Sequence, residues 1–492
     1  MKTNVLFAAS ESVPFIKTGG LADVAGSLPK YFDKEHYDVR VILPRYRCIK
    51  DSLRNNMKEI THFYTGFAGR EQYVGLMETE LSGVKFYFID NEFYFGGSWP
   101  YGSAETDIEK FAFFSYAVLS ILPHLDWKPD ILHCHDWQTG LIPVYLNDKF
   151  QGDLYFHHMK TIFTIHNLKF QGVHSIANVM ARTGLSSYYF TPDKLEAYGD
   201  GNLLKGGLVY ADRITTVSDT YASEIRMPFY GEGLDGLLRA KADRLSGIVN
   251  GIDTSDYDPK TDPALKFNFD INDAIAQKKK NKAALQEELG LVKDPDAFMI
   301  GIVSRLTDQK GIDLIDAVMD RLCQCGADIV ILGTGEQRYE NMFRYYASLY
   351  PSRVSANIFY SEALSRRIYA SADAFLMPSL FEPCGLSQLM SLRYGTLPIV
   401  RETGGLKDTV IPYNEITGEG TGFSFANYNA HEMLGIIRYA DSVYRDHREE
   451  WDKMVIRAMQ QDFSWYKSAE KYQKLYDTLA EEKRIEETPA DV

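Results

Sequence analysis

Cysteine is scarce in this chain, and the few that occur are scattered. The five residues are Cys48, Cys134, Cys323, Cys325 and Cys384, and no two of them form a Cys-x-x-Cys pair. This odd number without metal-ligand spacing argues against a disulfide scaffold and against a structural zinc site. We therefore expect free thiols, a reducing compartment and a cytoplasmic protein.

Long apolar runs and an excess of basic residues are also missing. No run reaches the roughly 18 residues that a membrane span requires. The chain has 53 Lys and Arg against 67 Asp and Glu, which gives a formal net charge of −14. This charge disfavours nucleic acid and anionic membranes as partners. An anionic substrate would need cations placed at its own binding site.

Short apolar runs alternate with helical patterns along the whole chain. The runs in the first half are Val5–Ala9, Val39–Leu43, Val84–Ile89, Ile131–His133, Thr161–Ile165 and Arg213–Val217. Those in the second half are Met299–Val303, Asp328–Leu332, Ala374–Met377 and Leu397–Val400. The alternation predicts an α/β fold with two doubly wound, mostly parallel sheets.

The pattern restarts after Ser246–Asn250, where we place a domain boundary. We expect an N-terminal domain at 1–248, a second domain at 249–464, and a C-terminal helix in 465–492 that packs back on the first domain. The stretch Asp273–Leu289 predicts a charged helix. Its run Lys278-Lys279-Lys280 is expected to form a solvated face.

One short sequence motif occurs in both halves of the chain. It reads Lys17-Thr18-Gly19-Gly20-Leu21-Ala22-Asp23 near the start and Glu402-Thr403-Gly404-Gly405-Leu406-Lys407-Asp408 downstream. Both copies follow a strand and open a helix. A glycine pair there lets the backbone approach a ligand and leaves amides free at a helix start, which suits phosphate. No Gly-x-Gly-x-x-Gly follows the first strand, which disfavours a dinucleotide dehydrogenase.

Polar residues follow the predicted strands, at the edge where ligands of open α/β sheets bind. Arg305 and Lys310 flank a strand-to-helix turn and can neutralise a diphosphate. Glu382, in Glu382-Pro383-Cys384-Gly385-Leu386, and the pair His166-Asn167 can meet sugar hydroxyls. No histidine stands next to Cys384, so we expect a packed thiol there. His133 and His135 leave a metal site open as an alternative, although no further ligand word accompanies them.

These sequence motifs occur together, in the order that is typical of one family. The chain resembles bacterial-type glycogen and starch synthases over essentially its whole length. The matching stretches are Lys17–Leu21, His135–Thr139, Thr164–Asn167, Gly231–Leu234, Val249–Asp253, Ser304–Leu306, Gln309–Gly311, Glu382–Leu386 and Thr403–Leu406. The resemblance implies two Rossmann-like domains that face a deep cleft, the GT-B arrangement. Because the candidate residues belong to both halves, we expect the halves to close around the substrate. It also implies retaining transfer of glucose from ADP-glucose to the non-reducing end of an α-1,4-glucan such as glycogen, without a cofactor or metal.

The resemblance also implies roles for single residues. Lys17 would contact ADP-glucose, Arg305 and Lys310 would hold its diphosphate, and His166 would lie by the glucosyl carbon. Glu382 would be important for catalysis. Further donor-binding candidates are Gly19, Gly20, Cys384, Gly385, Leu386, Thr403, Gly404 and Gly405. Candidates for binding the acceptor or the sugar are Glu11, Asp23, Asp136, Asn167 and Asn250.

The chain departs from the family pattern at two positions. Leu380 stands where the family commonly has an arginine, and Met390 stands where the broader superfamily often has a second glutamate. Retaining glycosidases use two carboxylates, and only one is assignable here, so we favour attack by the acceptor from the leaving-group face. Two alternatives stay open, another nucleotide-sugar enzyme (a UDP-sugar transferase or an epimerase) and a non-catalytic glucan-binding protein. The joint presence of Lys17, Arg305, Lys310 and Glu382 disfavours the second.

Overall fold

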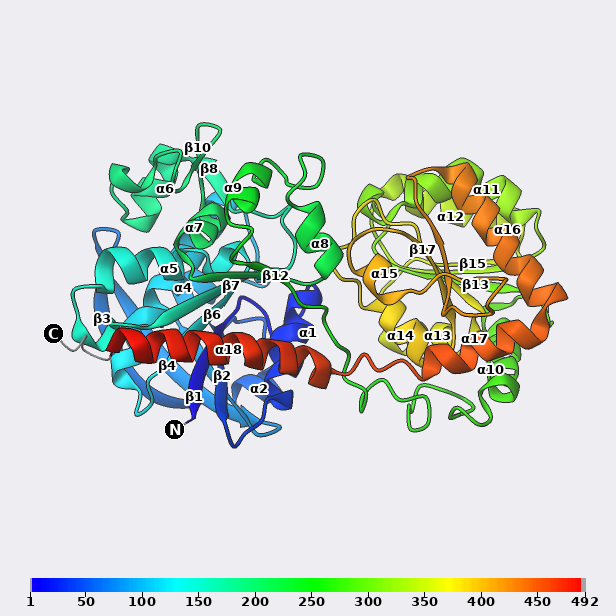
Figure 1. Cartoon of the computed structure of the whole chain (residues 1–492), viewed down its shortest axis with the longest axis horizontal. Coiled ribbons are helices and arrows are strands. Elements are labelled where there is room, and N and C mark those ends of the chain that lie inside the picture. The colour runs from blue at the N-terminus through cyan, green and yellow to red at the C-terminus, as the bar shows by residue number, and fades with distance from the viewer. Residues whose placement is uncertain (1, 488–492) are drawn as a thin grey trace. The chain divides into compact units, whose positions relative to one another are not determined.

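The computed structural model describes residues 2–487, and the chain divides into two compact units (Figure 1). Unit 1 comprises Met1–Val217, Ala222–Ile248 and Trp465–Val492. Unit 2 comprises Ser218–Tyr221 and Val249–Ser464. Each unit has its own sheet, mostly parallel in unit 1 and wholly parallel in unit 2, covered by helices, so the predicted α/β class is confirmed.

Unit 1 is built on a nine-stranded sheet in the order β12-β11-β7-β6-β1-β2-β5-β4-β3. The pairs from β12 to β5 are parallel, and β3 and β4 form an antiparallel hairpin at the edge. The strands are β1 (Thr3–Ala8), β2 (Tyr37–Pro44), β3 (Lys58–Phe67), β4 (Arg70–Leu81), β5 (Val84–Asp90), β6 (Ile131–His135), β7 (Lys160–Ile165), β11 (Arg213–Thr216) and β12 (Leu245–Gly247). A small antiparallel sheet adds β8 (Val173–Ser175), β10 (Asp200–Asn202) and β9 (Glu196–Ala197). Chain order reverses between β1 and β6, which is where ligands of such sheets bind.

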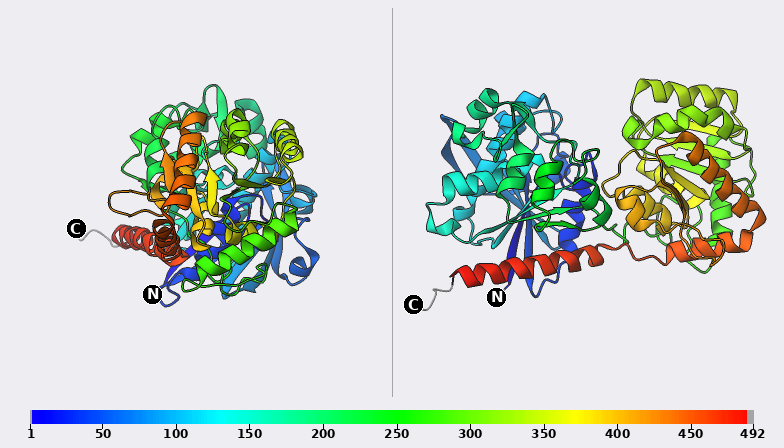
Figure 2. Two further views of the ribbon diagram at one scale, coloured as in Figure 1. Left: turned by 90° about the vertical axis from the view of Figure 1, so that its right-hand side faces the viewer. Right: turned by 45° about the horizontal axis from the view of Figure 1, so that its top comes forward.

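The helices of unit 1 cover this sheet and include the last helix of the chain. They are α1 (Gly20–Ser27), α2 (Asp51–Arg54), α3 (Glu92–Phe95), α4 (Ala104–Ile121), α5 (Leu141–Tyr145), α6 (Ile176–Thr183), α7 (Leu203–Tyr210), α9 (Asp235–Ala240), α18 (Trp465–Glu487) and, from Ala222 on, α8 (Asp219–Glu224). Helix α18 lies along the unit, as the right-hand view of Figure 2 shows. It buries Tyr472, Tyr476 and Leu479, and its Lys483 pairs with Asp130 at 2.5 Å. The C-terminal helix is therefore part of the core of unit 1.

Unit 2 has a six-stranded, all-parallel sheet in the order β15-β14-β13-β16-β17-β18. The strands are β13 (Met299–Val303), β14 (Asp328–Leu332), β15 (Val354–Asn357), β16 (Ala374–Met377), β17 (Leu397–Arg401) and β18 (Phe423–Phe425). Counted within the unit this is the 3-2-1-4-5-6 order of a Rossmann sheet. Its helices are α10 (Ala274–Leu289), α11 (Ile312–Cys323), α12 (Gln337–Leu349), α13 (Glu362–Ser371), α14 (Ser387–Arg393), α15 (Gly404–Thr409), α16 (Ala430–Asp446) and α17 (Arg448–Met459). The order reverses between β13 and β16, so the turns after these two strands meet.

The lysine run on α10 differs from the prediction of a solvated face. Lys280 is exposed, but Lys278 is buried. The Lys278 ammonium donates hydrogen bonds of 2.7 to 3.2 Å to the carbonyl oxygens of Tyr369, Ala370 and Tyr394 and to Thr396 Oγ1. The last carbonyls of a helix lack partners within it, and here a lysine supplies them at the end of α13. The prediction was wrong for Lys278, because the sequence does not show which carbonyl groups the fold leaves without hydrogen-bond partners.

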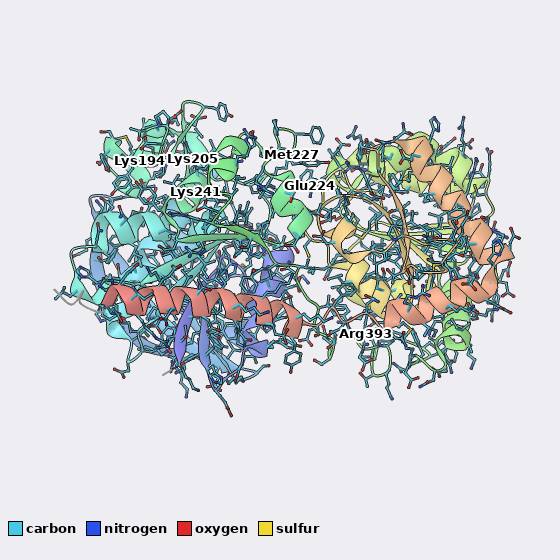
Figure 3. The ribbon with its side chains drawn as sticks, viewed as in Figure 1. Lys194, Lys205, Glu224, Met227, Lys241 and Arg393 are labelled. Carbon is cyan, nitrogen blue, oxygen red and sulfur yellow. The ribbon has the colours of Figure 1, made fainter. Side chains whose placement is uncertain are left out.

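Unit 1 uses a buried lysine in a similar way. Lys205, labelled in Figure 3, donates to the carbonyl oxygen of Pro192 at 2.6 Å and to that of Glu196. Its pKa is lowered by burial. The lysine ties the loop before β9 to helix α7, so we assign it a structural role.

Candidate functional site

The turns after β13 and β16 bring a lysine and a glutamate together. Lys310 Nζ lies 2.6 Å from Glu382 Oε2, and Ser379 Oγ donates to the same oxygen at 3.1 Å. The Glu382 side chain is 7% exposed and that of Lys310 is 19% exposed. A nearly buried carboxylate needs a partner, because an unpaired charge in such a place is costly. The pair therefore holds both side chains at the switch point of the unit 2 sheet.

A cavity of about 200 Å³ opens beside this pair. Arg305 and Lys310 line it, together with the hydroxyl side chains of Ser304, Ser379 and Ser387. The side chain of Arg305 is exposed and has no hydrogen bond or ion pair to any residue in 2–487. A guanidinium beside a cavity, without a carboxylate of its own, is suited to binding phosphate oxygens.

The two turns approach each other closely. Gly311 has φ +72°, and a Cβ on it would lie 2.1 Å from the carbonyl oxygen of Pro378. The Leu380 amide donates to the carbonyl oxygen of Gln309 at 2.9 Å. Only glycine leaves room for this contact. The backbone therefore fixes the spacing between the two turns.

The second glycine pair packs against the turn that carries Glu382. A Cβ on Gly404 would lie 1.9 Å from the carbonyl oxygen of Glu382, and one on Gly405 would lie 2.1 Å from that of Cys384. The Gly405 amide donates to the carbonyl oxygens of Glu382 and Pro383. The expectation of a free amide is therefore wrong at Gly405, because contact between two turns of the protein uses it. Donor binding by Thr403, Gly404 and Gly405 stays a prediction.

Cys384 lies in this turn, and the backbone of Asn250 contacts its thiol. Cys384 is buried, and burial raises the pKa of its thiol to about 12. This confirms the expected packed thiol and disfavours a nucleophile. Asn250 is 6% exposed, and its Oδ1 has no hydrogen-bond partner among residues 2–487. Gly385 and Leu386 continue from Cys384 into α14.

An arginine from another strand contacts the turn at Leu380, where the family commonly has an arginine. Arg401, at the end of β17, donates to the carbonyl oxygen of Leu380 at 2.6 Å and to that of Ser379 at 3.3 Å. A guanidinium therefore lies at this turn even though residue 380 is not an arginine. Met390 is buried in the core of unit 2.

In unit 1, Glu11 anchors the first glycine-containing turn. Its carboxylate accepts hydrogen bonds from the Thr18 amide, from Thr18 Oγ1 at 2.5 Å and from the hydroxyl of Tyr101. Lys17 Nζ lies 2.8 Å from Asp23 Oδ1. Glu11 and Asp23, both candidates for sugar binding, thus also hold the turn itself.

The two glycine amides of this first turn remain open. Those of Gly19 and Gly20 form no hydrogen bond within the described part of the chain, and a Cβ on Gly19 would meet no atom within 4 Å. Both glycines are exposed. The two copies of the repeated word therefore differ, because the first is open to a ligand and the second is packed against the protein.

Asp136 and His166 follow β6 and β7. Asp136 has φ +56° and ψ −179°, a region that residues other than glycine rarely occupy. Its Oδ1 accepts a hydrogen bond of 2.7 Å from the His166 amide, and burial raises its pKa to about 7. Burial lowers the pKa of His166 to about 3, so the imidazole is neutral. Asn167 Oδ1 accepts from the Lys169 amide at 3.1 Å, which closes a short turn.

The histidines do not form a metal site. His133 Nδ1 lies 2.8 Å from the Tyr476 hydroxyl, and its Nε2 lies 2.6 Å from Thr164 Oγ1. Both of its ring nitrogens are thus engaged. Across residues 2–487, no three His, Cys, Asp or Glu side chains are grouped so that they could hold a metal ion.

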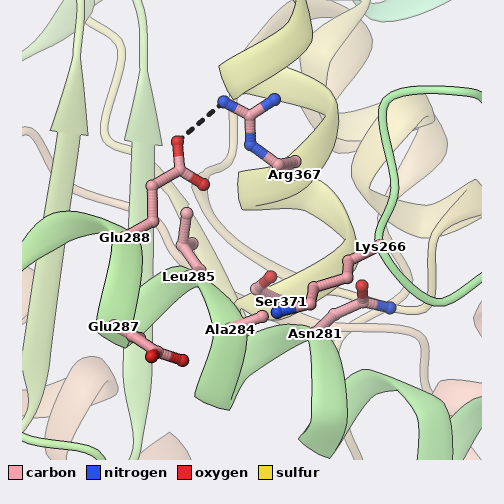
Figure 4. A pocket seen from close by; sticks show the side chains of 8 residues that line it. All are labelled: Lys266, Asn281, Ala284, Leu285, Glu287, Glu288, Arg367 and Ser371. Atoms are coloured by element: carbon pink, nitrogen blue, oxygen red, sulfur yellow. Dashed lines mark hydrogen bonds and ion pairs between the residues drawn. The ribbon is translucent and has the colours of Figure 1, made fainter.

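A second cavity lies between α10 and α13 (Figure 4) and has about 250 Å³. Its charged groups are Lys266, Arg367, Glu287 and Glu288, and Arg367 pairs with Glu288 at 2.8 Å. The charges balance, and none of the residues singled out as site candidates lines it. We therefore take the cavity at Arg305 and Lys310 as the candidate site.

Sequence reasoning missed two residues that support the site. Ser379 binds the Glu382 carboxylate, and Tyr101 binds that of Glu11. Ser379 lies two residues after the end of β16, so its position after a strand was a usable signal. Tyr101 is distant from any strand end, and nothing in the sequence marks it. None of the helices in residues 2–487 combines the length and apolar character needed to cross a bilayer.

Two family models match the two halves of the chain. The model described as "Starch synthase catalytic domain" matches residues 4–240, and "Glycosyl transferases group 1" matches residues 286–455. The chain is 65% identical over 476 residues to the glycogen synthase of Lachnospira eligens, covering 97% of this chain and 100% of that protein. It is 62% identical over 475 residues to that of Lachnoclostridium phytofermentans, covering 96% and 99%.

Solved structures agree with these matches. The catalytic domain of starch synthase IV from Arabidopsis thaliana, bound to ADP and acarbose, superposes with a TM-score of 0.90 at 32% identity. The match covers 98% of this chain and 100% of that chain. The sucrose-phosphate synthase of Thermosynechococcus elongatus has a TM-score of 0.62 at 16% identity, which supports the fold alone.

Proposed function

The chain belongs to the glycogen and starch synthase family of glycosyltransferases, and on that premise we propose that it uses ADP-glucose as donor and extends an α-1,4-glucan at its non-reducing end. The observation that carries the proposal is that Arg305 and Lys310 line one cavity at the switch point of unit 2, where Glu382 pairs with Lys310. That the Arabidopsis enzyme was solved with ADP bound supports the same nucleotide here.

Arg305 and Lys310 are proposed to bind the diphosphate. Negative charge grows on the diphosphate as its bond to the glucosyl carbon breaks. A fixed donor aimed at such charge typically contributes ~3–4 kcal/mol to transition-state stabilisation. Arg305 is available to an anion, while Lys310 is held in place by Glu382. Of the further donor candidates, Cys384, Gly385, Leu386, Thr403, Gly404 and Gly405 would shape the surrounding turns.

The reaction is proposed to retain configuration through attack from the leaving-group face. The bond from C1 to the diphosphate oxygen breaks, and the acceptor's 4-hydroxyl oxygen forms the new bond to C1. The departing phosphate accepts the proton of that hydroxyl. Glu382 is proposed to be important for catalysis, and Met390 cannot act as a second carboxylate. No step in this sequence calls for a cofactor or a metal.

Unit 1 is proposed to contribute to donor and sugar binding. Lys17, with the open amides of Gly19 and Gly20, is assigned to the donor, and His166 to the glucosyl group. Acceptor or sugar contacts are assigned to Glu11, Asp23, Asp136, Asn167 and, in unit 2, Asn250. Because Glu11 and Asp23 also bind Thr18 and Lys17, their loss would disturb the donor turn as well.

The test is incorporation of label from ADP-[¹⁴C]glucose or UDP-[¹⁴C]glucose into glycogen by the purified chain, with and without EDTA. We expect transfer from ADP-glucose that EDTA does not abolish. Equal or better use of UDP-glucose would contradict the donor assignment. Nucleotide release that does not depend on glucan would indicate a different nucleotide-sugar enzyme, and glucan binding without turnover would indicate a binding protein.

A further inference from the structure

Three histidine rings lie in a row in the core of unit 1. The rings of His133 and His135 are stacked with centroids 4.3 Å apart, and His135 Nδ1 lies 2.9 Å from His166 Nε2. His133 and His135 are fully buried, and the ring of Phe7 packs against both of them. The row therefore extends from the interior of the sheet to the partly exposed His166.

All three rings are neutral in the folded protein. Burial lowers the pKa of His133 and of His135 well below the ordinary value, and that of His166 to about 3. The hydrogen bond between His135 and His166 thus contains one proton, carried either by Nδ1 of His135 or by Nε2 of His166.

The surroundings of His135 Nε2, the other ring nitrogen, show which of these two protonation states is favoured. His135 Nε2 is buried and has no hydrogen-bond partner among residues 2–487. If His166 donated the shared proton, the proton of His135 would lie on Nε2, a buried N–H without an acceptor. Orphaned N–H groups of this kind are rare, whereas acceptors without a donor are tolerated more often.

We propose that His135 is a positioning residue that donates its Nδ1–H to Nε2 of His166 and thereby fixes His166 as the tautomer with its proton on Nδ1. Nδ1 of His166 has no partner among the described residues. His166 then presents a neutral N–H donor, suited to a sugar oxygen. Asp136 holds the backbone amide of His166 at 2.7 Å, so backbone and ring are oriented by different groups. The consequence for sugar binding rests on the proposed function, but the tautomer does not.

The direct test is long-range ¹H–¹⁵N NMR on the full chain labelled with ¹⁵N-histidine. The His166 signals are assigned by their loss in His166→Gln. We expect His166 Nδ1 to show the shift of a protonated ring nitrogen and Nε2 that of a bare one. The reverse pattern in the wild-type protein would overturn the proposal, whether or not the chain transfers glucose.

Variants test the positioning role. The side-chain amide of asparagine can place a donor where His135 has Nδ1, whereas leucine cannot. We expect His135→Leu to mix the two tautomers of His166 and lower kcat about tenfold, the effect of losing one hydrogen bond. His135→Asn should keep the Nδ1–H tautomer and most of kcat.

Tyr476→Phe is the matched control. It removes the hydrogen bond to His133, in the same core, without touching His166. We expect its His166 spectrum to match that of the wild type. Equal loss of kcat in all three variants with an unchanged His166 spectrum would show a merely structural effect and would contradict the proposal.

Discussion

Lys310 Nζ and Glu382 Oε2 lie 2.6 Å apart although 72 residues separate them in the chain. One follows β13 and the other follows β16, the two strands between which the order of the unit 2 sheet reverses. In a synthase that must stabilise a departing diphosphate, this contact fixes the position of the lysine ammonium and gives the glutamate its counter-ion. Loss of either partner changes the electrostatics of the other.

Lys310→Ala is expected to lower kcat by about 10²–10³ with a smaller change in KM, because the contact proposed between Lys310 and the diphosphate would strengthen as charge develops. Arg305→Ala should behave alike. Steady-state kinetics with ADP-glucose checks this, and the control is Lys279→Ala, at a partly exposed lysine on α10. A double variant at Lys310 and Glu382 should lose less kcat than the product of the losses in the two single variants, because the two side chains contact each other. A wild-type kcat in Lys310→Ala or in Arg305→Ala would contradict the assignment of that residue to the diphosphate.

Lys17→Ala is expected to raise the KM for ADP-glucose about tenfold with little loss of kcat. Lys17 is partly exposed on the open turn and is assigned to the bound donor rather than to the charge that grows during transfer. Donor titrations at saturating glycogen measure this. Lys58→Ala, on the exposed strand β3, serves as the matched control. A change confined to kcat would instead place Lys17 at the reacting diphosphate.

Gly404→Ala is expected to lower the free energy of unfolding by about 2 kcal/mol and to impair activity, because the new Cβ would strike the Glu382 carbonyl at a position of positive φ. Gly19→Ala is the contrasting variant. Its Cβ meets nothing within 4 Å and its φ is extended, so stability should change by less than about 0.5 kcal/mol. Urea denaturation and donor KM measure both variants. Equal stability of the two proteins would show that the second turn is not packed as described.

Lys278 should make stability depend on pH on the alkaline side. Its pKa is lowered by burial from 10.5 to about 7. Between these values the unfolded chain binds more protons than the folded one, so the free energy of unfolding rises with pH, by up to about 1.4 kcal/mol per unit. Lys278→Met should lose this rise, whereas Lys279→Met should keep it. Urea midpoints at pH 7 and pH 9.5 measure the difference, and identical slopes in wild type and Lys278→Met would contradict the assignment.

The repeated apolar runs were enough to predict the α/β class, because strands buried on both faces read as short continuous apolar stretches. The β3–β4 hairpin was not predicted. Its strand β3 is half exposed along most of its length, and such a surface leaves no continuous apolar run. The order of the charged and glycine-rich motifs likewise predicted the family. The comparisons confirm this prediction.

The sequence by itself determined which residues carry charge at the ends of the strands, since those identities are local. Only the tertiary structure decided what each one touches. It separated two similar words, leaving Gly19 open and packing Gly404 against Glu382. It placed Lys278 in the core, and it paired His135 with His166. The physical reason is that hydrogen bonds and ion pairs between distant segments depend on which backbone groups the fold leaves without partners, and local residue patterns do not encode that demand.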